Sequence, residues 1–414
     1  MEKAFSDKTD AGIRLIWMRF DSESIREGVR LLHEASDAGD PDAPCFLART
    51  RMGDPYIRDY AGQEADFREA ASLLRESIRR GSACAVLVAR RCGLLTPSVR
   101  RDMPLSFKQA WDAVLARASE DPFCQYFIGS ALCYGDAPEH GGPAPHPSSP
   151  ETDAGNALRA IPYLEKALDA GLLDAGDLLY SLHAGNRERQ RTIVRRCAAT
   201  GSPYWEARCG SLCYEDGRDA EALRWFEKAA RHGQIGSWYD VGLLYERGLG
   251  APKDLSKAAE AYRKSAEQGF SDAQQALGIL TFFGRGVPRD PARAAYWLRE
   301  AAAADLPLAC GLLGLCFLRG FGVQQDDGEA FALLTRFADA RNEEDLSDES
   351  GFFTELAGML LNGLGELYAE GRAGPENLKE GVALFQEAAA FGDADARRAL
   401  VRFKKNWLGK WVRV

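Results

Sequence analysis

The sequence has little of what metal centres and redox sites need. Only five of its 414 residues are histidine, and no two have a His-Glu-x-x-His or similar ligand spacing. No glycine-rich loop followed by Lys-Ser or Lys-Thr is present, and the scattered cysteines and histidines supply no recognisable nucleophile and base pair. We therefore expect no metal, no cofactor and no enzymatic activity. The histidines are His33, His140, His146, His183 and His232.

Positive net charge, a long apolar run and a secretory leader are also missing. The formal net charge is −9, which argues against a general nucleic-acid binder because such proteins carry a basic face for phosphates. No run of about 18 apolar residues could cross a bilayer, so no integral membrane segment is expected. The first residues, MEKAFSDKTDAGIRLIWMRF, lack a basic stretch followed by an apolar segment and a cleavage site. A cytoplasmic location is the resulting expectation.

Cysteine is present ten times but in no organised pattern. Cys209 and Cys213 are one helical turn apart, and most of the others stand alone in apolar stretches. No pair has zinc-finger spacing. Because no secretory signal is visible and the chain is long, reduced and buried thiols are favoured over disulfides.

A pattern of small and capping residues recurs every 36 residues in the second half of the chain. A fixed period of this length is typical of a solenoid, in which each unit buries its apolar face by stacking on its neighbours. The matched columns are Gly242, Gly278 and Gly314; Gly248, Gly284 and Gly320; Gly250, Gly286 and Gly322; Asp254, Asp290 and Asp326; Ala258, Ala294 and Ala330; and Ala266, Ala302 and Ala338.

Each unit predicts two helices joined by a glycine loop. In the unit that begins near residue 237, Val241 and Tyr245 lie four apart on one helical face. Gly248 and Gly250 then end the first helix, and Asp254 is a good N-cap for the second. We therefore predict an all-α solenoid of about ten antiparallel helix pairs.

The repeat signature divides the chain into three parts. Residues 1–202 keep the helix alternation without the glycine signature and contain a Pro/Gly-rich loop at 135–155. Residues 203–392 carry the clear units, interrupted by an acidic insertion at 341–355. Residues 393–414 are basic and aromatic and predict a helix that caps the last repeat; a contact for an acidic partner and an interfacial membrane helix are the alternatives.

The clear units resemble the Sel-one-like repeat (SLR), a relative of the tetratricopeptide repeat. The resemblance depends on the spacing Gly-x-x-Tyr-x-x-Gly-x-Gly from Gly242 to Gly250, on Asp254, and on Ala258 and Ala266 in the second helix. It implies a right-handed superhelix of stacked helix pairs whose concave surface binds proteins or peptides, often as an adaptor in signalling or quality control. No catalytic residues come with the resemblance.

Candidate binding residues are first-helix positions that are not needed for packing on the second helix. They vary between units, as a binding surface built on a constant frame would, and Trp and Tyr are favoured interface anchors. The alternative is that the aromatic side chains pack between neighbouring repeats. The candidates are Trp238, Tyr239, Glu246, Gln274, Gln275 and Phe282.

The function that these patterns favour is a non-enzymatic scaffold or adaptor that binds a protein or peptide in the concave groove. The alternative is a regulatory subunit that docks on one enzyme or envelope complex through the basic-aromatic segment at 393–414. Deleting residues 404–414 should abolish binding under the alternative, and should only destabilise the last repeat under the first hypothesis.

Overall fold

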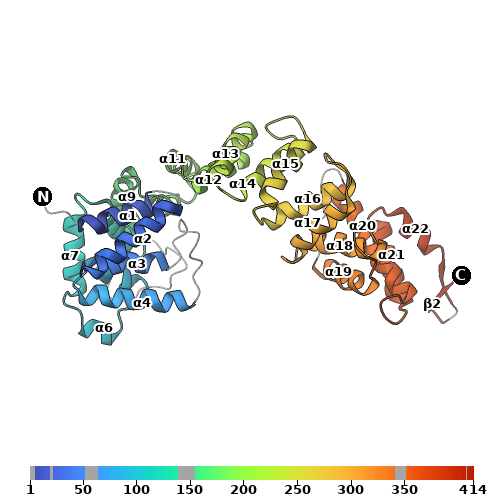
Figure 1. Ribbon diagram of the computed structural model, residues 1–414, viewed down its shortest axis with the longest axis horizontal. Helices are drawn as coiled ribbons and strands as arrows, with labels where there is room; N and C mark the ends of the chain where they lie inside the picture. The colour runs from blue at the N-terminus through green and yellow to red at the C-terminus, as the bar shows by residue number, and fades with distance from the viewer. Residues whose placement is uncertain (1–4, 19–21, 52–63, 139–153, 341–350, 407) are drawn as a thin grey trace. The chain divides into compact units, whose positions relative to one another are not determined.

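The computed structural model describes residues 5–18, 22–51, 64–138, 154–340, 351–406 and 408–414 (Figure 1). The chain forms two compact units, Met1–Leu212 and Cys213–Val414. Regular structure in the described residues is almost entirely α-helical, which confirms the predicted fold class. Most of the loop predicted at 135–155 and of the insertion predicted at 341–355 lies outside the described residues, as do His140 and His146.

The first unit is built of consecutive helix pairs. Close packing joins α1 to α2, α3 to α4, α5 to α7, α8 to α9 and α10 to α11. The short α6 lies between α5 and α7, and α12 contains the boundary between the units. The helices are α1 (Asp7–Trp17), α2 (Ser22–Asp37), α3 (Ala43–Arg51), α4 (Glu64–Arg79), α5 (Ala83–Arg91), α6 (Pro97–Arg101), α7 (Phe107–Arg117), α8 (Pro122–Cys133), α9 (Ala154–Asp169), α10 (Asp174–Leu182), α11 (Arg187–Ala198) and α12 (Pro203–Glu215).

The second unit continues the same arrangement with higher regularity. The pairs α14 and α15, α16 and α17, α18 and α19, and α20 and α21 pack together, and each second helix also contacts the first helix of the next pair. The predicted helix pairs are confirmed. The elements are α13 (Asp219–Arg231), α14 (Ser237–Arg247), α15 (Leu255–Ala266), α16 (Ser271–Phe283), α17 (Pro291–Ala302), α18 (Pro307–Arg319), α19 (Asp327–Ala340), α20 (Phe352–Glu370), α21 (Leu378–Ala390), α22 (Ala394–Leu400), β1 (Phe403–Lys405) and β2 (Trp411–Arg413).

The repeated spacing of glycine and aspartate sets the ends of these helices. Gly248, Gly284 and Gly320 end α14, α16 and α18 with φ of 76°, 72° and 68°, a left-handed conformation that costs glycine little. Asp254 and Asp290 then accept backbone N–H bonds in the first turn of α15 and α17. The loop between the two helices is therefore specified by residue type.

The second glycine of each loop sets how closely neighbouring repeats stack. A Cβ at any of these three positions would overlap a backbone carbonyl group at the start of the second helix of the preceding repeat. Ser256 of α15 also donates a hydrogen bond of 3.0 Å to the carbonyl oxygen of Gly286. The contacts join Gly250 to Asp219, Gly286 to Leu255 and Gly322 to Pro291.

A third glycine column lets the two helices of one repeat approach each other. A Cβ on Gly242 would lie 2.5 Å from the ring of Tyr262. A Cβ on Gly278 would lie 2.9 Å from Leu298. The missing side chain therefore makes room for a large apolar residue of the second helix, which offsets the helix-propensity cost of glycine, about 1 kcal/mol.

Helix α20 is longer than the other first helices and contacts a repeat that is not its neighbour. It has 19 residues, against 13 in α18. The ring of Phe352 at its start lies 5.3 Å from that of Phe283 at the end of α16, and the guanidinium of Arg285 lies 4.3 Å from the Phe352 ring. Between them, every residue of α18 from 309 to 316 is buried. The core of α16 to α21 is consequently continuous.

The C-terminal segment corrects one sequence prediction. The helix predicted over 393–414 ends at Leu400, and the chain continues as an antiparallel hairpin in which Phe403 pairs with Arg413. The hairpin still covers the last repeat, because the ring of Phe403 stacks on Phe385 of α21 at 6.0 Å. The predicted helix is wrong because the tip residues favour a turn.

Asn406 and Gly409 build that turn. The side-chain oxygen of Asn406 accepts hydrogen bonds from the backbone N–H groups of Leu408 (2.9 Å) and Lys410 (3.0 Å). Gly409 has a φ of 72°. An Asn that bonds the backbone two residues on, followed by a glycine with positive φ, is a strong signal for a turn.

In the first unit, a buried ion pair ties α3 to α10. Nη2 of Arg49 donates to Oδ2 of Asp174 at 2.8 Å, and the two side chains are only 12% and 8% exposed. The guanidinium also lies 4.9 Å from the ring of Trp17 and 5.2 Å from that of Tyr126. Because water is excluded here, each charge depends strongly on its partner.

Candidate partner-binding surface

The six predicted site residues occupy three positions of the repeat, each sampled in two successive units. The structure places three of them on α14 and the other three on α16, each 36 residues after its counterpart. The three columns can therefore be compared directly between repeats. They pair Trp238 with Gln274, Tyr239 with Gln275, and Glu246 with Phe282.

On α14, the two aromatic side chains are half-buried. The ammonium of Lys264 on α15 lies 4.3 Å from the centre of the Trp238 ring, a cation–π contact. The Tyr239 ring packs against Tyr262 at 5.5 Å and against Phe270 at 5.4 Å. Each ring thus contacts its own repeat on one side and remains partly open to solvent.

Glu246 is held by a hydrogen bond from the second helix. The hydroxyl of Tyr262 donates to its Oε2 at 2.8 Å. Burial and the nearby Glu246 carboxylate raise the pKa of Tyr262, so the phenol stays protonated and remains a donor. Glu246 is half-buried and its position is fixed.

On α16, two of the predicted wall residues lie in the interior, which corrects their assignment. Gln274 is buried and donates to the carbonyl of Ala266 at 3.3 Å. Phe282 is 5% exposed, because Phe283 and the loop residue Phe321 pack on it. Gln275 remains half-buried, and its side-chain oxygen accepts from a backbone N–H of the next repeat.

Burial of the three columns increases along the array. In the next repeat the same positions are Cys310, Gly311 and Leu318, and all three are buried. Trp238, Tyr239 and Glu246, in the repeat formed by α14 and α15, are all half-exposed. The accessible part of the predicted site is therefore what we call the α14 surface: Trp238, Tyr239, Glu246 and Gln275.

Sequence reasoning missed Asp240, which lies beside this surface. Burial raises its pKa to about 6, and no side-chain hydrogen bond or ion pair to it is found within the described residues. The charged groups that act on neighbouring Tyr239 are Asp272, Asp240, Arg247 and Glu246. The sequence did contain an indication that Asp240 is buried, because the same repeat position holds the apolar residues Ala276 and Leu312 in the following repeats.

The raised pKa of Asp240 predicts a pH-dependent cost to folding. Its folded pKa lies above the ordinary value of about 3.9, so stability is lost as pH rises from about 4 to about 6, and the loss is complete at pH 7. We expect Asp240→Asn to raise the free energy of unfolding by about 1 to 3 kcal/mol at pH 7, and to leave it unchanged near pH 4. Urea unfolding of both proteins at the two pH values measures this, and an equal difference at both would contradict it.

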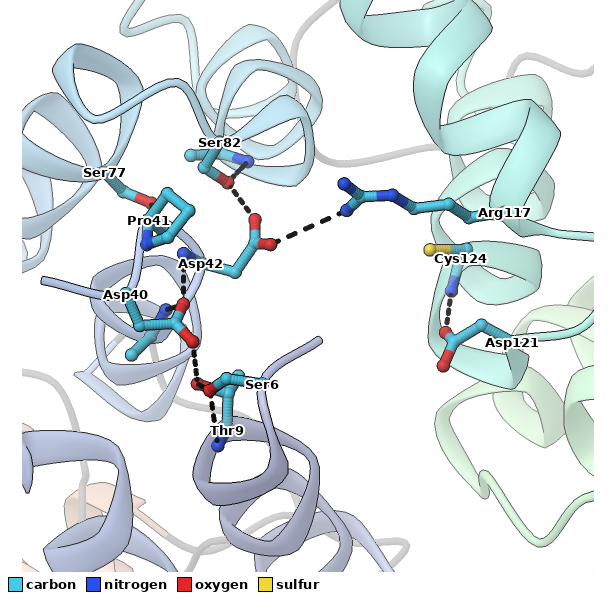
Figure 2. Close-up of polar contacts among 12 residues, drawn as sticks. Ser6, Thr9, Asp40, Pro41, Asp42, Ser77, Ser82, Arg117, Asp121 and Cys124 are labelled. Carbon is cyan, nitrogen blue, oxygen red and sulfur yellow. Dashed lines mark hydrogen bonds and ion pairs between the residues drawn. The ribbon is translucent and has the colours of Figure 1, made fainter. Parts of the chain in front are cut away.

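A second polar cluster lies inside the first unit (Figure 2). Ser82 donates a hydrogen bond to Asp42, and Nη1 of Arg117 lies 3.6 Å from the other oxygen of this carboxylate. Thr9 donates to Asp40 at 2.9 Å. Burial raises the pKa of Asp42. Because Asp42 and Ser82 are both buried, the pair is closed to a substrate and joins helices instead.

Other reactive groups are equally enclosed. All ten cysteines are free thiols, nine of them buried and Cys92 half-buried, as expected. Burial raises the pKa of Cys316 to about 12, so this thiol stays protonated. Within the described ranges, no three His, Cys, Asp or Glu side chains are placed to hold a metal ion.

Comparison with known proteins identifies the repeats. The model of the Sel1 repeat family matches residues 206–234, 239–270, 271–306, 307–342 and 360–393. Comparison with curated proteins found no match.

Comparison with solved structures also found similar proteins. The crystal structure of c5321, a protective antigen present in uropathogenic Escherichia coli strains that displays an SLR fold, is 18% identical with a TM-score of 0.51, over 90% of this chain and 81% of that one. A Sel1 repeat protein from Oxalobacter formigenes is 27% identical over 54% of this chain and 87% of that one, with a TM-score of 0.43. The part of the chain between residues 206 and 393 is therefore built of five Sel1 repeats.

Proposed function

We propose that the chain is a non-enzymatic interaction scaffold or adaptor that binds a protein or peptide at the α14 surface. The observation that carries the proposal is the change in burial along the repeat columns. Trp238, Tyr239 and Glu246 are half-exposed on a frame that buries the same positions two repeats later. A surface needed only for stacking would be buried to a similar extent in each repeat.

The chemistry of this surface suits a protein partner. A partly exposed Trp ring supplies a large rigid contact area, and Trp and Tyr are enriched among residues that dominate binding energy. Glu246 offers a fixed carboxylate about two turns further along the same helix, since Tyr262 holds it. Together they offer an apolar anchor and, about 12 Å along the helix axis, a hydrogen-bond acceptor.

We expect the double variant Trp238→Ala, Glu246→Ala to lose a partner that the wild-type chain captures from a lysate of its native host. With that partner purified, its affinity should fall at least tenfold, since interface anchors of this kind are each worth about 2 kcal/mol. Tyr239 is left in place because its ring packs against Tyr262 and Phe270. Mass spectrometry and calorimetric titration are the measurements.

The matched control is Tyr296→Ala, which removes an exposed aromatic ring from the second helix α17. Its binding should equal that of the wild type. Unchanged circular dichroism would show that both variants fold. If the double variant binds as tightly as the control, the α14 surface is not the binding site.

A further inference from the structure

The C-terminal hairpin is the most basic part of an acidic chain. Residues 394–414 contain seven Lys and Arg against the single acid Asp395, although the whole chain has a net charge of −9. We use the name basic hairpin for residues 402–406 and 408–413. Its charge opposes that of the rest of the protein, so a negatively charged partner would be attracted to this end and repelled elsewhere.

One face of the basic hairpin is fixed to the last repeat. Phe403 stacks on Phe385, and Arg413 forms an ion pair of 2.9 Å with Glu376 and donates to the carbonyl of Ala369. Side chains alternate between the faces of a strand, so Lys404 and its cross-strand neighbour Val412 lie on the opposite face. The hairpin therefore presents that face on a supported platform.

The cations of the basic hairpin are largely uncompensated. Arg402, Lys404 and Lys410 are exposed, and none forms an ion pair within the part of the chain that the structure describes. Lys405 is also exposed, with its ammonium 5.2 Å from the Trp411 ring. Like charges crowded on a short hairpin repel each other unless an anionic surface is bound.

An apolar side chain projects from the tip among these cations. Leu408 is 58% exposed, and the hydrogen bond from its backbone N–H to Asn406 helps to hold the turn that displays it. At the base of the hairpin, Val401 is 79% exposed. Exposed aliphatic groups within a cationic surface give two independent contributions to binding, one apolar and one electrostatic.

We infer that the basic hairpin docks the protein on an anionic lipid surface. Juxtaposed Lys and Arg side chains bind acidic headgroups, and an apolar side chain such as Leu408 enters the headgroup boundary. A protein partner is less favoured, because a standard interface uses about 20 to 30 residues on each side and pockets for its anchors. The hairpin is smaller and its exposed groups project outward. The inference does not depend on the α14 surface.

Co-sedimentation of the full chain with vesicles tests the inference. In 0.1 M salt we expect at least tenfold stronger binding to phosphatidylserine–phosphatidylcholine vesicles than to pure phosphatidylcholine, falling in 0.5 M salt. Each cation near such a surface contributes about fivefold, so Lys404→Glu, Lys410→Glu should weaken binding at least twentyfold. Leu408→Ser, which keeps every charge, should weaken it about tenfold.

The matched control is Lys253→Glu, Lys257→Glu, which makes the same change in net charge at two exposed lysines beside the start of α15, in a different repeat from the one that holds the hairpin. It should bind vesicles like the wild type. Equal binding of the wild type to both vesicle types overturns the inference, and so does an equal loss in the control. Capture of an acidic protein that the hairpin variant loses, without lipid binding by the wild type, would assign the hairpin to protein docking instead.

Discussion

Replacing Gly286 by alanine is expected to destabilise the second unit by about 3 kcal/mol. Two costs add at this position. Its φ of 74° costs a residue with a side chain about 1 to 2 kcal/mol, and the new Cβ overlaps the carbonyl group of Leu255, which overpacks the contact by about 1 to 3 kcal/mol. The carbonyl cannot move away without shifting α15, so the strain falls on the stacking of two repeats.

Gly269→Ala is the matched control, because Gly269 has a similar positive φ of 86° but nothing within 4 Å of an added Cβ. This variant should lose only the free energy that a side chain costs at positive φ, about 1 kcal/mol. Urea unfolding, combined with hydrogen exchange of peptides from α15 to α17, measures both variants. Equal effects of the two substitutions would show that close backbone approach is not what the second loop glycine provides.

In the first unit, Arg49→Met is expected to cost about 3 to 5 kcal/mol. The substitution keeps apolar volume beside Trp17 but leaves the Asp174 carboxylate without its cation in a site that water does not reach. Thermal and urea unfolding of this unit are the measurements. Arg30→Met removes an exposed arginine with two acidic neighbours and should leave stability unchanged within error.

A double variant separates the ion pair from general packing. If the unpaired charge causes the loss, Arg49→Met with Asp174→Asn should recover at least half of it, because no isolated charge then remains. If the double variant instead loses as much stability as the two single variants added together, the effect belongs to packing around the guanidinium.

The repeat frame could be predicted from sequence because it is encoded locally. Gly248 and Asp254 act on the helix ends next to them, so their spacing alone predicts two helices and a loop. Exposure could not be predicted in the same way. Phe282 and Glu246 share one repeat position, yet Phe282 is buried by Phe321 from the following repeat, a contact between residues 39 apart in the sequence.

The C-terminal segment covers the last repeat, but its local secondary structure is not the predicted helix. Its basic and aromatic composition favoured an amphipathic cap, and the capping position is occupied. Asn406 and Gly409 carried a turn signal that the helix prediction passed over. Asp240 was missed because a lone carboxylate in a helix is ordinary in sequence, and only the apolar residues at the same position of the next two repeats indicated that it would be buried.

The contact between Phe352 and Phe283 changes how this array should unfold. An array in which each repeat contacts only its neighbours behaves as a one-dimensional chain of elements that can open one at a time. A contact that passes over α18 couples next-nearest neighbours, so α16, α18 and α20 should lose amide protection as one cooperative block. Helices α13 to α15 lie outside that block, and therefore the helix that carries Trp238, Tyr239 and Glu246 should be free to open without it.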